Sequence, residues 1–209
     1  FRTIQDGMKL TKGEEIHSAQ NNIFQNKIVH LATKYNTILR DTKKEGGFNY
    51  TNKRYIHYEV IGGLTKMLQD DKYYDRAGQI ALKEVKKWDN FPQGTDLTEE
   101  EAARLVNLDA AVQRFEELMD YLIILRENCE PLNTMTYGRD ATFIRNMFFI
   151  HKNIVYMKSL PEIEQETRFS EMNETVLTKH TPIHDQIKVW GGYGGMNEIM
   201  DKYREVYDA

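Results

Sequence analysis

The strongest hydrophobic pattern in the chain lies between Thr98 and Cys129, where apolar residues recur at alternating steps of three and four. Such spacing places them along one face of an α-helix: Leu105, Leu108, Val112, Phe115, Met119 and Leu122. Thr98 and Glu101 have the spacing of a capping box at the helix start, and Pro131 disfavours helix beyond its end. At about 1.5 Å per residue the helix would extend on the order of 48 Å, so we expect it to be the spine of a bundle.

Helical periodicity also marks four other segments: 11–41, 50–69, 72–89 and 140–160. Thr11 and Glu14 form a second capping-box pair at the start of the first segment, and Pro161 ends the last. Alternation of apolar and polar residues, the pattern of a half-buried strand, does not extend beyond about four residues. The sequence therefore predicts an all-α fold, a bundle of about five amphipathic helices.

The predicted helical domain occupies residues 11–160 and is flanked by two segments of different character. Residues 1–10 form an irregular N-terminal arm. Residues 161–209 begin with an acidic stretch, for which we expect a short helix or an ordered excursion. They continue as an extended C-terminal tail rich in glycine and aromatic residues, and the tail ends in a short helix over 196–207.

Two adjacent glycines, Gly62 and Gly63, lie inside the second predicted helix. Each costs roughly 1 kcal/mol of helix stability relative to alanine, so their presence needs a reason. We interpret the pair as a point of close helix–helix approach or a kink, in preference to a ligand-binding role.

Charge and composition narrow the function classes. The net charge is -4, and acidic and basic residues are interleaved, which argues against direct nucleic-acid binding because such surfaces show clustered basic residues. The mean hydropathy of -0.65 is polar for a globule of this size, as expected for helices with one solvated face or for a chain that buries surface against partners. No stretch approaches the roughly 18 consecutive apolar residues that a transmembrane helix requires.

A helical-bundle enzyme or metal-binding protein is one alternative. Glu14 and His17 have the Glu-x-x-His spacing of carboxylate-bridged di-iron bundles, and Glu116 or Glu117 would supply further acids. A di-iron site needs a second such pair, and no other histidine has a glutamate three residues before it. We therefore interpret Glu14 as a capping residue and expect no catalytic residue, cofactor or metal.

The C-terminal tail contains two further segments of interest. His180 and His184 are spaced to share a zinc ion on a helix, but Pro182 between them disfavours a regular helix. The glycine-rich segment 190–195 lacks the lysine and Ser/Thr of a Walker loop, and it suits packing onto a neighbouring protein. We expect the tail to bind a partner through Trp190, Tyr193, Met196, Tyr203 and Tyr207.

These patterns favour a non-catalytic structural subunit of a large multiprotein assembly, whose partners are other protein subunits. The chain begins at Phe1 and has a single cysteine, Cys129, as expected for a mitochondrial chain whose leader has been removed. A mitochondrial energy-transducing complex, either of the respiratory chain or an ATP synthase, is then the expected assembly, with a cytoplasmic location as the alternative. A free helical adaptor that binds a partner helix along the stripe from Leu105 to Leu122 is a third hypothesis.

Overall fold

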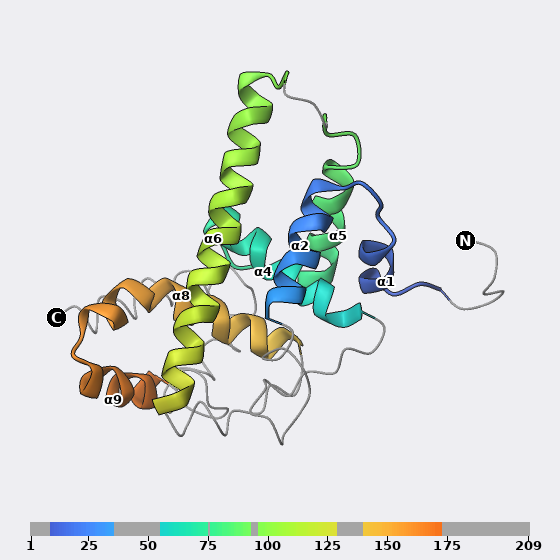
Figure 1. The fold of residues 1–209 in the computed structure, drawn as a ribbon. Helices are drawn as coiled ribbons and strands as arrows, with labels where there is room; N and C mark the ends of the chain where they lie inside the picture. The colour runs from blue at the N-terminus through green and yellow to red at the C-terminus, as the bar shows by residue number, and fades with distance from the viewer. Residues whose placement is uncertain (1–8, 36–54, 75, 93–95, 129–139, 173–209) are drawn as a thin grey trace.

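The computed structural model describes residues 9–35, 55–74, 76–92, 96–128 and 140–172, and this part of the chain is all-helical, as predicted (Figure 1). Its helices are α1 Lys12–His17, α2 Ile23–Lys34, α4 Ile56–Asp70, α5 Ala77–Lys87, α6 Glu99–Asn128, α8 Asp140–Ser159 and α9 Glu162–Met172. The N-terminal arm up to residue 8 and the tail from residue 173 lie outside the described residues.

The centre of the bundle is α4, and not the longest helix as the sequence suggested. Helix α4 packs against α1, α2, α5, α6 and α8, whereas α6 packs mainly against α4, α2 and α8. The side chains of Val60, Leu64, Met67 and Leu68 are buried, as predicted, and Ile61 and Thr65 on its other sides are buried as well. A helix buried on all sides takes the core position, whereas α6 keeps one face in solvent.

The hydrophobic stripe of α6 faces the core as its spacing predicted. Leu108, Phe115, Met119 and Leu122 are buried, and Leu105 packs against the edge of the same core. The capping box at the helix start is present, since Glu101 N–H donates to Thr98 Oγ1 and Thr98 N–H donates to the Glu101 carboxylate. The stripe from Leu108 to Leu122 is therefore occupied by packing in the core.

The segment predicted as one helix from residue 11 contains a break and forms two helices, α1 and α2. The Thr11–Glu14 capping box starts α1, as predicted. The break lies at Asn21, which has a φ of 57°, and at the buried Asn22, whose Oδ1 accepts from Gln25 N–H and caps α2. Asn22 Nδ2 also donates to the Val85 carbonyl at 2.8 Å. Bonding to α5 therefore favours a cap at Asn22 over continuous helix.

Helix α4 begins at Ile56, and residues 50–54 of its predicted range lie outside the described residues; helix α5 begins later than its apolar periodicity suggested. The residues before them, Tyr55 and Arg76, have φ values of 59° and 61°, so each is left-handed and the helix starts at the next residue. Residues 72–74, predicted as the first turn of the third helix, precede α5 in the structure. Between the two helices, Asp71 at the end of α4 and Arg76 before α5 both have positive φ, and α5 folds back along α4 in the most extensive helix pairing of the described bundle.

Gly62 and Gly63 lie where α4 and α5 meet, which agrees with the interpretation of a close helix–helix approach. A Cβ added at Gly63 would overlap Ala77 Cβ and lie 2.8 Å from Ala77 Cα. A Cβ at Gly62 would lie 2.8 Å from both Ala81 Cβ and Ile28 Cδ1. The two glycines therefore set the distance between these helices.

The C-terminal helices complete the described fold. Helix α8 packs on α4 and ends before Pro161, and the acidic segment after it forms the short helix α9. Tyr121 of α6 donates to Gln165 Oε1 of α9 at 3.2 Å and fixes α9 beside the end of α6. Of the helices in the described ranges, none combines the length and the hydrophobicity that crossing a membrane would require.

Candidate functional site

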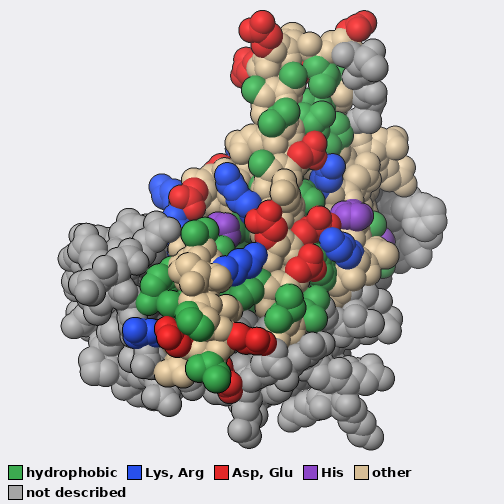
Figure 2. All heavy atoms as spheres, turned by 60° about the vertical axis from the view of Figure 1, so that its left-hand side comes forward, with side chains coloured by type: hydrophobic (Ala, Val, Ile, Leu, Met, Phe, Trp, Pro, Cys, Tyr) green, Lys and Arg blue, Asp and Glu red, His purple; other side chains and the backbone are tan. Residues whose placement is uncertain are grey.

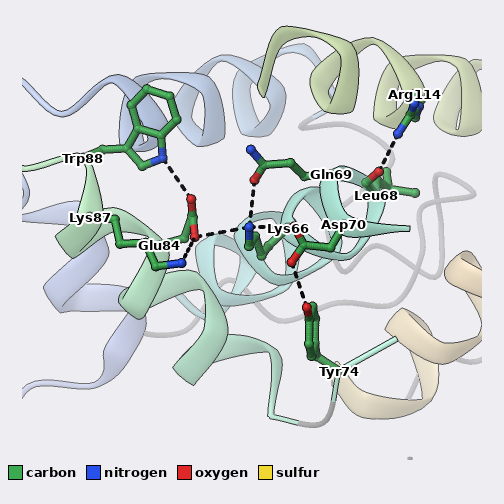
Figure 3. Close-up of polar contacts among 9 residues, drawn as sticks. All are labelled: Lys66, Leu68, Gln69, Asp70, Tyr74, Glu84, Lys87, Trp88 and Arg114. Atoms are coloured by element: carbon green, nitrogen blue, oxygen red, sulfur yellow. Dashed lines mark hydrogen bonds and ion pairs between the residues drawn. The ribbon is translucent and has the colours of Figure 1, made fainter. Parts of the chain in front are cut away.

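Buried charges are the first place to look for chemistry, and the structure places one at the junction of α4 and α5 (Figure 3). The Glu84 side chain is 4% exposed. Its Oε1 accepts from Trp88 Nε1 at 3.1 Å, and its Oε2 pairs with Lys87 at 3.1 Å and with Lys66 at 3.4 Å. Both carboxylate oxygens therefore have partners within the protein.

Lys66, which pairs with Glu84, is 14% exposed, and its amine also has several hydrogen-bond acceptors. Besides Glu84, its Nζ contacts Gln69 Oε1 at 3.2 Å and Asp70 Oδ1 at 2.8 Å. The other Asp70 oxygen accepts from Tyr74 O–H at 2.8 Å. Burial and the hydrogen bond to Asp70 raise the pKa of Tyr74 to about 12, so the phenol stays protonated and keeps donating.

We call this group of residues the Glu84 cluster: Lys66, Asp70, Tyr74, Glu84, Lys87 and Trp88. The geometry of this cluster favours a structural role, because each charged side chain in it is bonded to another member. The pair between Lys66 and Glu84 connects α4 to α5. Arg104 of α6 covers its Trp88 side with the guanidinium 4.0 Å from the ring and donates to the Lys87 carbonyl. Arg114 of α6 donates to the Leu68 carbonyl near the end of α4.

A second set of charges joins α2 to α6 at the surface. Lys27 pairs with Asp109 at 2.7 Å, and Glu116 pairs with Lys34 at 2.9 Å and with His30 at 3.2 Å. Burial pushes the pKa of Glu116 upward, but the hydrogen bonds from Lys34 and His30 outweigh burial and hold that pKa below its usual value. These pairs fix the rotation of α6 against α2.

The structure uses the residues of the predicted metal face for other purposes. The Glu14 carboxylate accepts from Thr11 N–H at 2.8 Å, which is its capping role, and His17 stacks on Tyr55 with ring centroids 3.9 Å apart. Glu116 is engaged by α2, and Glu117 accepts from the Gln113 amide. Across the ranges that the structure describes, no three His, Cys, Asp or Glu side chains are grouped to hold a metal ion.

Two half-buried histidines, His57 and His151, have pKa values well below the usual value for histidine. Burial, and then the neighbouring His17, lowers the pKa of His57 to about 4. Burial also lowers the pKa of His151 to about 4, with Arg114 and Lys152 adding to the effect and Asp71 opposing it. Both imidazoles are therefore neutral in the folded protein at physiological pH.

This burial predicts a pH dependence of stability. In the unfolded chain both histidines titrate near 6.5, so between pH 6.5 and 4 the unfolded state binds more protons than the folded state. We expect the free energy of unfolding to fall by about 1–2 kcal/mol between pH 7 and 5, a value reduced for the partial exposure of the rings. Urea unfolding at pH 7 and at pH 5 measures this change in the free energy of unfolding. In a His57→Gln/His151→Gln protein the pH 7 to 5 loss should shrink by more than half, and an unchanged loss would contradict the assignment.

The most exposed apolar surface in the described part of α6 lies opposite its core stripe. We call it the outer face of α6 and define it by Ala102, Ala103, Val106 and Ala110. Val106 is 68% exposed, both alanines before it are exposed, and Ala110 is half-buried. In Figure 1 the first turns of α6 rise above the ends of α2 and α5, and Figure 2 shows hydrophobic side chains at this end of the molecule, below the acidic ones.

The residues predicted to bind a partner, Trp190, Tyr193, Met196, Tyr203 and Tyr207, lie outside the described residues, as do His180, His184 and Cys129. Sequence reasoning missed both the Glu84 cluster and the outer face of α6. The sequence did contain a signal for the outer face, because Ala103, Val106 and Ala110 recur at steps of three and four beside the stronger core stripe.

Comparisons of this chain with models of protein families, with curated proteins and with solved structures find no match.

Proposed function

We propose that this protein is a non-catalytic structural subunit of a large multiprotein assembly, held there by protein–protein contacts. The observation that carries the proposal is the outer face of α6, whose exposed valine and alanines stand on turns that project beyond the neighbouring helices. Contiguous apolar surface on a projecting element is typical of an interaction site.

The charged groups support the same function. The Glu84 cluster and the pairs between α2 and α6 use their carboxylates and amines to bond one helix to another. Charged side chains that are bonded in this way hold the helices in fixed positions, as a structural subunit requires. The mean hydropathy of -0.65 supports it as well, because a polar chain of this size is expected where partners supply part of the buried surface.

As to the assembly, we propose a mitochondrial energy-transducing complex, either of the respiratory chain or an ATP synthase. The support is the single cysteine, Cys129, which leaves the chain without an intramolecular disulfide framework. The alternative of a metal-dependent bundle enzyme is weakened by the capping role of Glu14. The adaptor alternative is weakened because its binding stripe is buried in the core, as Leu108 and Met119 show.

A truncation tests the contribution of the tail. Removing residues 181–209, which contain the aromatic residues assigned to partner binding, should release the subunit from its assembly and leave the helical content of the described fold unchanged. Native gel migration of the tagged full-length and truncated proteins, with circular dichroism of both, measures the two effects. Full incorporation of the truncated chain would contradict the role assigned to the tail.

A further inference from the structure

We infer that the outer face of α6 binds a helix of another polypeptide, one that carries lysine or arginine beside an apolar seam. The inference rests on the proposed function and specifies the chemistry of one partner. It begins from the spacing of Ala103, Val106 and Ala110, which lie on one line along α6, on the side away from Leu108. Small side chains on either side of an exposed valine allow a second helix to approach closely and pack around it.

The negative charge beside this face indicates that the partner is basic. Asp96, Glu99 and Glu100 are exposed at the start of the helix, and Figure 2 shows acidic side chains above the hydrophobic ones at this end of the molecule. Three carboxylates exceed the roughly half positive charge that a helix N-terminus carries, so this end is negative. A partner with cations on the flanks of its apolar seam would complement it.

The cation that α6 itself contributes nearby does not neutralise this end. Arg104 points toward the core side, where its guanidinium lies over the Trp88 ring and donates to the Lys87 carbonyl at 3.1 Å. Lys27 of α2 is paired with Asp109, the residue before Ala110. A second copy of this chain would bring another acidic helix start, which is why the complementary occupant is a basic helix from a different polypeptide.

A photo-crosslinking amino acid at position 106 of the full-length protein, in its native assembly, tests the inference. Val155 of α8 is the matched control, because it is a similarly exposed valine on a helix that carries Lys152 and Lys158 near it. We expect position 106 to crosslink to one segment of another polypeptide, and mass spectrometry of the linked peptide should show an amphipathic sequence rich in lysine and arginine. Position 155 should not crosslink to that segment.

Charge reversal provides the second readout. Replacing Glu99→Lys and Glu100→Lys together should reduce the crosslink from position 106 by about tenfold while the helical content stays unchanged. A crosslink to this chain's own residues, to a second copy or to a segment without basic residues would overturn the inference, as would no crosslink or no response to charge reversal. If the protein still migrates with a large assembly, only this interface is wrong; if it migrates alone, the proposed function is wrong.

Discussion

Replacing Glu84 by alanine is expected to lower the free energy of unfolding by about 2–4 kcal/mol. The change removes the acceptor of Trp88 Nε1 and one of the anions around Lys66, both in the interior between α4 and α5. Lys66 keeps its contacts with Asp70 and Gln69. We therefore expect a loss in the free energy of unfolding that lies in the lower part of, or below, the roughly 3–5 kcal/mol typical of a broken buried ion pair. Chemical unfolding followed by circular dichroism measures the change.

Lys87→Ala is the matched control for Glu84→Ala. It removes a cation bonded to the same Glu84 oxygen, but the Lys87 side chain is 61% exposed and its charge is largely screened by solvent. We expect an effect below about 1 kcal/mol. Equal losses from the two variants would show that the Glu84 cluster contributes no more than a surface ion pair.

Replacing Gly63 by alanine is expected to cost about 2–3 kcal/mol, although alanine is the better helix former by roughly 1 kcal/mol. The new Cβ would overlap Ala77 Cβ and lie 3.0 Å from the Ala77 carbonyl carbon, which belongs to the backbone and cannot move aside as a side chain can. Helices α4 and α5 would have to separate. The midpoint and slope of urea unfolding give the loss.

A second substitution identifies the cause of that loss. Ala77→Gly removes the atom that the new Cβ overlaps, so the Gly63→Ala/Ala77→Gly protein should be more stable than the two single effects predict when added together. We expect a coupling of at least about 1 kcal/mol in this double-mutant cycle. A Gly63→Ala protein as stable as the original would mean that the two glycines do not set the helix spacing.

Local signals in the sequence were sufficient to predict most helices. The capping boxes at Thr11 and Thr98 depend only on residues three positions apart, and both are present in the structure. The stripe of α6 has one period throughout, so its buried face was readable. The two glycines in α4 were also correctly interpreted, because glycine in a helix interior is unfavourable unless another backbone comes close.

The features that sequence reasoning missed depend on contacts between distant residues. Ile16 and Ile23 continue one apolar period across the break between α1 and α2, and Asn22 favours a cap there only because the Val85 carbonyl lies beside it. Glu84 resembles the exposed charges around it until α4 covers it. The central position of α4 likewise follows from packing on several sides, which a single amphipathic face does not indicate.

The native mass of the endogenous protein tests the central claim most directly. Gel filtration of a gentle detergent extract, followed by detection of this chain, separates the two possibilities. We predict elution with a complex many times larger than the 24.6 kDa of the chain, together with a constant set of other polypeptides. Elution as a single chain near 24.6 kDa would contradict the assignment as a subunit and would return attention to small ligands and metals.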